Sequence, residues 1–591
     1  MKSFRLFVIH LFLFASHLTQ AQTVNLPVLD RWFWPNPGLP RNAASSLFQD
    51  SLSLRPFQLH QVNSYPSHQI NEPVSAQYKL VDFPEKQFPE SFSIEFWLLD
   101  HVNQPIGFEI FMGELSVFAL WDGNYYFPKE IKEQKPWSEY WTHLVLTYES
   151  GVLEIWENGV LISLQKQLLP EKTIVLQSYL KQEPYMELDD WVKHLTSYQN
   201  ALNADQIQRN FEAHQAIKET GKRFPDRFHF MAEPYLFAPS PSSVQLTFET
   251  DRPAETKIRY GTELPLQNSI SLPAGKSTIM TVTIPDLIPA QAYFYQVIAE
   301  DSVGNTLDSG LLTFRTSHDT NNPVTFGIVS DTETRPWING QIGLKLWDER
   351  PDFILHMGDV TDGGEEDDQW QWTQEYFPGT AALTSRVPIA PVAGNGEGDL
   401  YWYNQYHPQA ADNGYYKFSY GAGEFFMMNS NDMESLQPGK QQYEWLKNAL
   451  ESSKSSWKFV SMHHAPYSSD EDDYGNTWKG PSSHGDRRLQ PIIRLMENNG
   501  VRVMFFGHLH TYMRTFPMRG DEIDMREGIH FIQVGGMGGN LEDFAPTRIP
   551  FAAKTYRGYH YLTGTLTSDG FELSMYNTEG ALLDRLLLTD Y

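Results

Sequence analysis

Five short polar stretches, each placed directly after an apolar run, carry residue types that bind metal ions. They are residues 331–333 (DTE), 358–362 (GDVTD), 394–397 (GNGE), 462–466 (MHHAP) and 507–510 (GHLH). Carboxylates, an asparagine and neutral imidazoles suit zinc, manganese or iron far better than calcium. One such stretch alone is typical of a turn or a helix cap. The recurrence of the same residue types in order predicts a metal site.

The apolar runs before these stretches read as buried strands. VTFGIVSD ends at Asp331 and DFILHMGD ends at Asp359, with the helical pattern INGQIGLKLWDER between them. WKFVSMHH and VRVMFFGHLH are later runs that end in histidines. Buried strands that alternate with helices predict a layered α/β core. Ligand sites of such sheets lie at the carboxyl ends of the strands, so we expect the polar side chains to meet there.

With these motifs, residues 323–591 resemble the calcineurin-like metallophosphoesterases, and specifically the purple acid phosphatases. The resemblance implies an α/β sandwich that hydrolyses phosphoesters with two divalent or trivalent ions of iron, zinc or manganese. A hydroxide between the ions would attack phosphorus. The ligands would be Asp331, His510 and Asp359 for one ion, and the same Asp359 with Asn395, His463 and His508 for the other.

Two further residues match family positions near the phosphate. Arg514 lies where the family often has an arginine after the GHxH motif, and His484 resembles a histidine of the phosphate pocket. The alternative for each residue is a structural role.

Two departures from the family pattern concern the metal ligands. The purple enzymes carry GDxxY, whose tyrosinate binds ferric iron, whereas the fifth residue here is Asp362. Asp362 is a candidate substitute ligand, and we expect a colourless protein. Glu333 replaces the usual glycine or histidine of the first motif, and either binds a metal or solvates its loop.

The third departure is Gly396, which stands where the family has a histidine that protonates the leaving oxygen. General acid catalysis contributes about 10²–10⁴-fold, so we expect a slower enzyme or one that needs good leaving groups. Glu397, His464 and His484 are the candidate replacements, and Gly396→His is the direct test of the loss.

The N-terminal half reads as β-structure in two regions. Residues 50–217 alternate in SIEFWLLD, contain hairpin turns at 149–151 and 158–159, and place Asn203 as a helix N-cap. This region resembles laminin-G-like, concanavalin A-like jelly rolls, which implies a glycan or cell-surface ligand or a spacer. After a polar linker (218–227), residues 228–318 resemble the fibronectin-III-like domain that precedes the catalytic domain of purple acid phosphatases.

Composition limits the partners and the compartment. The 591 residues carry a formal net charge of −28 and no cysteine, which excludes thiol ligands and disfavours nucleic acid as a partner. Residues 1–21 have the basic, apolar and small-residue segments of a cleaved signal peptide, and no later segment is long enough for a membrane span. We therefore expect a secreted or periplasmic protein, of bacterial origin.

Two acidic loops, 362–370 and 469–476, follow the second and fourth motifs, and aromatic residues 401–403 follow the third. Acidic loops beside the site would disfavour polyanionic substrates. The sequence therefore predicts an exported phosphoesterase that hydrolyses small phosphomonoesters. The alternatives are a phosphodiesterase acting on small diesters, or a degenerate phosphatase domain in a glycan- or surface-binding protein.

Overall fold

The computed structural model describes most of the second half of the chain and separate segments of the first. The described residues are 28–31, 60–64, 74–79, 91–99, 106–112, 115–121, 124–127, 130–133, 141–166, 174–180, 192–198, 200–222, 228–237, 240–318, 322–333, 335–408, 414–470, 482–545 and 549–589. The expected signal peptide, residues 223–227 of the linker and residues 471–476 of the second acidic loop lie outside them. The chain divides into two compact units, Met1–Phe33 with Phe57–Ala216, and Trp34–Pro56 with Ile217–Tyr591.

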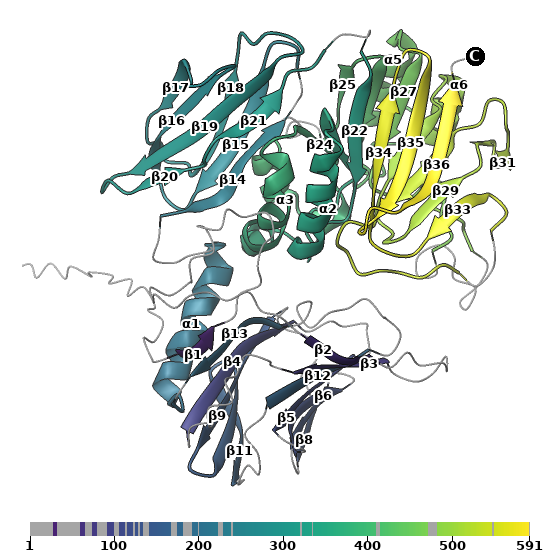
Figure 1. Ribbon diagram of the computed structural model, residues 1–591. Helices are drawn as coiled ribbons and strands as arrows, with labels where there is room; N and C mark the ends of the chain where they lie inside the picture. The colour runs from purple at the N-terminus through teal and green to yellow at the C-terminus, as the bar shows by residue number, and fades with distance from the viewer. Residues whose placement is uncertain are drawn as a thin grey trace, which may run out of the picture. The chain divides into compact units, whose positions relative to one another are not determined.

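The described strands of the first unit form two antiparallel sheets (Figure 1). The first sheet has the order β1-β13-β4-β9-β10-β11 and the second has the order β2-β3-β12-β5-β6-β7-β8. A β-rich unit is what the sequence predicts, while membership of the laminin-G-like family stays a prediction. The strands are β1 (Val28–Arg31), β2 (His60–Ser64), β3 (Val74–Lys79), β4 (Ser91–Leu99), β5 (Ile106–Met112), β6 (Leu115–Trp121), β7 (Asn124–Phe127), β8 (Glu130–Glu133), β9 (Trp141–Glu149), β10 (Val152–Glu157), β11 (Val160–Lys166), β12 (Ile174–Leu180) and β13 (Val192–Tyr198).

The local signals of this unit predict its turns and its helix correctly. Ser150 and Gly151 turn β9 into β10, and Asn158 and Gly159 turn β10 into β11, all four with positive φ. Helix α1 (Ala204–Thr220) begins after Asn203, whose side-chain oxygen accepts the backbone N–H of Gln206 at 3.0 Å. This bond satisfies an amide that the first helical turn leaves without a partner.

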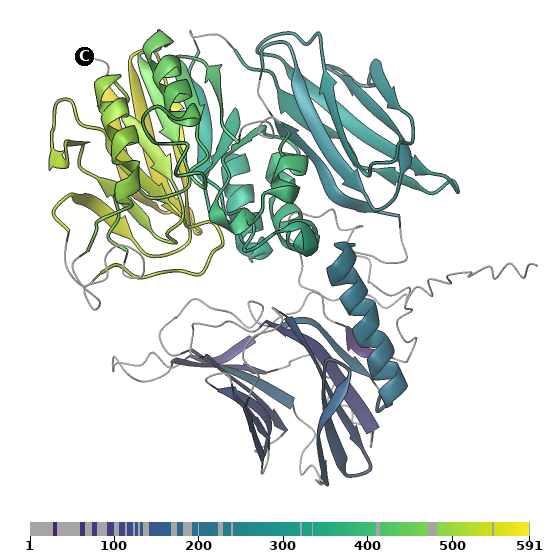
Figure 2. The same cartoon turned by 180° about the vertical axis from the view of Figure 1, so that it is seen from behind.

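The second unit contains two large sheets and one smaller sheet (Figure 2). Their orders are β18-β15-β14-β24-β23-β22-β34-β35-β36, β25-β26-β27-β28-β32-β29-β33 and β17-β16-β19-β20, with β21 paired to β19; β30 and β31 form a separate pair. The strands are β14 (Phe230–Phe237), β15 (Val244–Thr250), β16 (Ala254–Gly261), β17 (Asn268–Leu272), β18 (Ile279–Ile284), β19 (Ala292–Asp301), β20 (Thr306–Asp308), β21 (Leu312–Arg315), β22 (Val324–Val329), β23 (Phe353–His356), β24 (Ile389–Pro391), β25 (Tyr416–Tyr420), β26 (Gly423–Met427), β27 (Trp457–Ser461), β28 (Val503–Phe506), β29 (Tyr512–Thr515), β30 (Met518–Arg519), β31 (Glu522–Ile523), β32 (His530–Val534), β33 (Ala552–Tyr556), β34 (His560–Leu566), β35 (Gly570–Asn577) and β36 (Leu582–Thr589).

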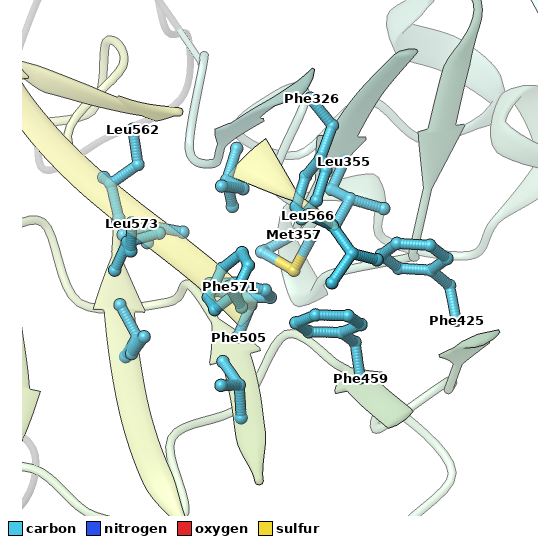
Figure 3. Packing of buried hydrophobic residues seen from close by; sticks show 14 of the residues in the cluster. Phe326, Leu355, Met357, Phe425, Phe459, Phe505, Leu562, Leu566, Phe571 and Leu573 are labelled. Atoms are coloured by element: carbon cyan, nitrogen blue, oxygen red, sulfur yellow. The ribbon is translucent and has the colours of Figure 1, made fainter. Parts of the chain in front are cut away.

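A single apolar core fills the space between the two large sheets. Phe326 of β22, Phe459 of β27 and Phe571 of β35 meet there with ring centroids 5.0–6.0 Å apart (Figure 3). Removing these rings from water is the main favourable contribution to the association of the sheets.

Helices cover the outer faces of the sheets. Helices α2 (Pro336–Asp348) and α3 (Phe377–Thr384) pack on the nine-stranded sheet, where Ile354 of β23 points away from the central core. Helices α5 (Gln441–Ser452) and α6 (Gln490–Asn498) pack on the seven-stranded sheet. The layered α/β sandwich expected for residues 323–591 is therefore present.

The parallel strands fix where the polar motifs lie. Strands β22, β23 and β24 run parallel in one sheet, and β26, β27, β28 and β32 run parallel in the other. The first three motifs follow β22, β23 and β24, whereas the last two follow β27 and β28. The candidate site therefore receives side chains from both sheets.

Residues 228–318, expected as a separate sandwich, share a sheet with residues 323–591. Strand β14 pairs in parallel with β24, through Phe237 and Ile389, and β15 and β18 extend the same sheet. Because β24 leads into the third motif, this region is continuous with a strand that supports the candidate site.

Among the described helices, none has the length and hydropathy needed to cross a membrane.

Candidate metal centre

Four residues of the candidate site have left-handed backbone conformations. The φ angles are 57° at Asp331, 37° at Glu333, 49° at Asp359 and 75° at His508. Residues with a side chain rarely adopt this region, and such strain clusters at functional sites. The chain therefore turns sharply as it leaves β22, β23 and β28.

The first donor group consists of Asp331, Glu333 and His510, all buried. The Nε2 atom of His510 lies 2.9 Å from a Glu333 carboxylate oxygen and 3.5 Å from Asp331 Oδ1. Burial raises the pKa of Glu333 to about 7, although the nearby His510 lowers it. Two carboxylates and an imidazole thus face one point.

The second donor group consists of Asp359, His463 and His508, with Asn395 beside it. The Nε2 atom of His463 lies 3.1 Å from Asp359 Oδ2 and 3.0 Å from Asn395 Oδ1. His508 has its ring 5.1 Å from that of His463, and its backbone N–H donates to Asp331 Oδ1 at 3.1 Å. This bond links the two donor groups.

Hydrogen bonds on the far sides of two rings determine what those rings offer. His463 Nδ1 lies 2.8 Å from the carbonyl oxygen of Met357, and His510 Nδ1 lies 2.6 Å from that of Asn540. A carbonyl only accepts, so each Nδ1 carries the proton and each neutral ring presents an Nε2 lone pair to its donor group. Lone pairs that face carboxylate oxygens this closely require a proton or a cation between them.

The electrostatics favour a positive charge in both groups. Burial lowers the pKa of His463, but the Asp359 carboxylate outweighs burial, and the pKa is raised to about 9. The pKa of His510 is likewise raised, by Glu333 and Asp331 against the effect of burial. In addition, Asp331 Oδ2 is buried and has no hydrogen-bond partner. The donors and this unpartnered oxygen fit a bound cation in each group.

Two of the proposed metal-site residues are solvent-exposed. Asn395 lies next to the second donor group, whereas Asp362 belongs to neither donor group, although its carboxylate, after burial, adds to the raised pKa of Glu333. Glu333 occupies the first group instead. The sequence left Glu333 open as a ligand, and only the backbone turn after β22 brings it to His510.

His464 and Glu397 lie close to the donor groups but are already engaged. The His464 ring lies 4.8 Å from that of His508, and its Nδ1 is 2.8 Å from Ser430 Oγ. Burial, with the neighbouring His463 and His508 rings, lowers the pKa of His464 to about 2. Glu397 is fully buried, and its two oxygens accept the backbone N–H groups of Val360 and Gly394.

Arg514 and His484 make contacts of a structural kind. The Arg514 guanidinium forms two hydrogen bonds, of 2.7 and 3.0 Å, with Asp584 on β36. The His484 ring packs edge-on against Phe551, with centroids 5.8 Å apart. The described contacts join neither side chain to the donor groups.

Gly396 is enclosed by backbone. A Cβ at this position would lie 2.1 Å from the carbonyl oxygen of Thr361. The Gly396 N–H donates to Asp359 Oδ1 at 2.6 Å, and its carbonyl oxygen accepts the N–H groups of Gly363 and Gly364. Gly396→His, the test that the sequence suggests, therefore changes more than the general acid, because no side chain fits here without moving the loop.

Comparison with known proteins agrees with this architecture. Residues 328–512 match the family described as Calcineurin-like phosphoesterase. Two similar proteins of Arabidopsis thaliana are "Probable inactive purple acid phosphatase 27", 24% identical over 243 residues, and "Purple acid phosphatase 15", 26% identical over 234 residues. These alignments cover 36% and 33% of this chain, and 38% and 41% of the relatives, so the chain spans less than half the length of either.

A solved structure has a similar fold. The purple acid phosphatase PPD1 from yellow lupin (Lupinus luteus) seeds superimposes with a TM-score of 0.53 at 16% identity, covering 88% of this chain and 93% of that one. At this identity the likeness concerns the fold alone. Residues 328–512 thus form a calcineurin-like metallophosphoesterase domain with purple acid phosphatases among its relatives.

Proposed function

We propose that the chain is a metal-dependent hydrolase of small phosphomonoesters. The observation that supports this most strongly is the pair of donor groups at the ends of parallel strands, in which Nε2 lone pairs face carboxylate oxygens. The first cation would be held by Asp331, Glu333 and His510, and the second by Asn395, His463 and His508, with Asp359 between them. Two bound cations supply Lewis acidity and neutralise charge on phosphoryl oxygens.

The residues of the chain orient these donors. The Gly396 N–H fixes one oxygen of Asp359, which leaves the other to face His463. The carbonyl groups of Met357 and Asn540 hold His463 and His510 in the tautomer that binds a cation through Nε2.

Protonation of the leaving group is the weak step of the proposed reaction. Both oxygens of Glu397 are bound to backbone amides, and His464 is bound to Ser430 and stays neutral. Without an effective general acid, the rate depends on how well the alcohol leaves as an anion.

A graded series of aryl phosphates tests this proposal. We expect two metal ions per chain, and rates that rise steeply as the pKa of the released phenol falls. His508→Ala abolishes hydrolysis of the most activated ester. A rate that does not change with phenol pKa contradicts the missing acid, and a wild-type chain that binds no metal contradicts the enzyme itself.

The alternatives stay open to direct tests. A relative from Hordeum vulgare, "Nucleotide pyrophosphatase/phosphodiesterase", is 24% identical over 234 residues, which cover 34% of this chain and 60% of that protein. Faster hydrolysis of aryl diesters than of monoesters would favour that activity. A chain that takes up no metal but binds glycans through the first unit would favour the alternative of a degenerate phosphatase domain in a binding protein. Export by the N-terminal signal is also a proposal, tested by fractionating cells that express the full chain.

A further inference from the structure

Two loops beside the donor groups are joined into one structure. We call residues 359–370 and 394–406 the paired loops; the first carries Asp359 and the second carries Asn395. The Gly396 carbonyl oxygen accepts three donors from the first loop: the Thr361 hydroxyl and the N–H groups of Gly363 and Gly364. Further along, the Trp402 indole N–H donates to the Glu366 carbonyl oxygen at 3.0 Å. Movement of one loop therefore moves the other.

A buried carboxylate from residues 228–318 accepts hydrogen bonds from the far ends of both loops. Glu249 on β15 is 3% exposed and belongs to residues 228–318. It accepts the Tyr406 hydroxyl at 2.6 Å and the Gln369 side-chain amide at 3.3 Å. Gln369 also donates to the Tyr406 hydroxyl at 2.8 Å, which closes a triangle of bonds. A third partner of Glu249, the Thr278 hydroxyl, donates to it at 3.0 Å.

The cost of burying Glu249 shows that the contact is specific. A buried carboxylate destabilises a fold unless donors surround it. The three hydrogen-bond partners of Glu249 all donate to it, and burial still raises its pKa to about 7. Strand β14 adds a second bond to the same end of the loops, from the Tyr235 hydroxyl to the Tyr406 carbonyl oxygen at 2.9 Å.

We propose that Glu249 is a positioning residue for the metal centre: it holds Gln369 and Tyr406, and through the paired loops it keeps Asp359 and Asn395 in place. The inference rests on the proposed function for its effect on catalysis, but not for its effect on the loops. A displacement of about 1 Å at reacting groups costs on the order of 10²-fold in rate. The β-region 228–318 is then part of the catalytic apparatus and not a separable module.

The test compares Glu249→Ala, Glu249→Gln and Tyr406→Phe with a matched control, Tyr295→Phe. The Tyr295 hydroxyl is also buried and also joins region 228–318 to the phosphoesterase region, through the Ser385 carbonyl oxygen at 2.6 Å, but Ser385 lies outside the paired loops. The readouts are amide hydrogen exchange in residues 359–370 and 394–406, binding of Mn²⁺ by the full chain, and kcat and KM on an aryl phosphate.

We expect Glu249→Ala and Tyr406→Phe to speed exchange in both paired loops, to weaken binding of the second Mn²⁺ about 10-fold, and to lower kcat about 10- to 100-fold with little change in KM. Glu249→Gln, which keeps the shape and an acceptor oxygen, recovers most of each effect. Tyr295→Phe stays within about twofold of wild type in all three readouts, although it also loses a buried hydrogen bond.

Equal effects of Tyr295→Phe and Tyr406→Phe overturn the proposal, since the bonds are then only structural. Unchanged exchange in the paired loops of Glu249→Ala overturns it too. If wild type neither binds Mn²⁺ nor hydrolyses the ester, the proposed function fails, while the exchange readout still decides whether Glu249 holds the loops.

Discussion

The two donor groups differ in composition and in how firmly the fold holds them. The first group has two carboxylates and one imidazole, all buried. The second has one carboxylate and two imidazoles, with His508 half-buried and Asn395 exposed at its edge. Oxygen-rich sites favour ions such as Mn²⁺, and imidazole-rich sites suit zinc or iron. Two neighbouring sites of one centre thus have different preferences and different access to solvent.

This difference teaches how the centre is supported. The first group is anchored by the buried turn after β22 and by the Asn540 carbonyl oxygen. The second depends on Asn395, whose loop is joined to the preceding loop by hydrogen bonds from the Gly396 N–H to Asp359 and from the Val360 N–H to Glu397. Substitutions of Asp359, of a ligand in one group, and of residues in the supporting loops should therefore have effects on metal binding and rate that can be told apart.

The largest expected effect follows from Asp359→Asn, because Asp359 belongs to the second donor group and is the ligand that we propose both cations share. The neutral amide would remove the shared negative charge, so we expect fewer than two metals per chain and at least about 10³-fold slower hydrolysis. Metal analysis and single-turnover rates measure this. The control is Asp362→Asn, an exposed residue outside both groups; a comparable loss from this control would make Asp362 the ligand that the sequence suggested.

Glu333→Gln should affect the first group alone. Loss of one of the two carboxylates of this group should weaken the binding of a cation there by about 10- to 100-fold, while the affinity of the second site stays unchanged. Titration of Mn²⁺ resolves the two sites. Asp362 stands where the purple enzymes have their tyrosine ligand, so iron-loaded wild type should lack a tyrosinate band in the visible spectrum. Observing that band would contradict our assignment of Glu333.

Gly396→His should destabilise the domain and leave the reaction unimproved. The new Cβ overlaps the Thr361 carbonyl oxygen and pushes the paired loops apart, at a cost of about 1–3 kcal/mol. Thermal unfolding and rates on a poor leaving group measure the two parts. Gly275→His serves as a control, since a Cβ there has its nearest neighbour, the Ser277 backbone nitrogen, at 3.9 Å, and neither Gly275 nor Gly396 has a left-handed φ. Faster turnover of poor leaving groups would show that the loop adapts.

The smallest expected effect is a pH dependence of stability from Glu249. Burial raises its pKa in the folded state from the ordinary 4.5 to about 7, so the folded state binds the proton more tightly than the unfolded chain does. The contribution of Glu249 to the free energy of unfolding is fully present below pH 4.5. It declines as the pH rises towards 7, by roughly 1 kcal/mol per pH unit. Unfolding of wild type and Glu249→Gln at pH 5 and 7 measures it. Identical pH slopes in the two proteins would exclude Glu249 as the source.

The sequence identified the strands and the order of the motifs because both depend on local pattern. Asp331, Asp359 and His463 follow apolar runs, and the structure places them at neighbouring strand ends. The turn at Asn158 and Gly159 and the cap at Asn203 were also predictable, since their signals act over a few residues.

Contacts between distant segments were not predictable from these patterns. The choice of Glu333 over Asp362 depends on a left-handed turn, and the closure of Gly396 depends on a loop more than 30 residues earlier in the chain. The pairing of β14 with β24 joins segments about 150 residues apart. Nothing in the composition of either segment indicates its partner.

The sequence by itself determined the donor types, their order and the layered α/β class, because residue chemistry and hydrophobic periodicity are local properties. The tertiary structure alone decided which donors meet, which position admits no side chain, and which distant carboxylate holds the loops. Distances of about 3 Å between ligand atoms arise only when two sheets pack on one core, and that packing is a property of the whole second unit.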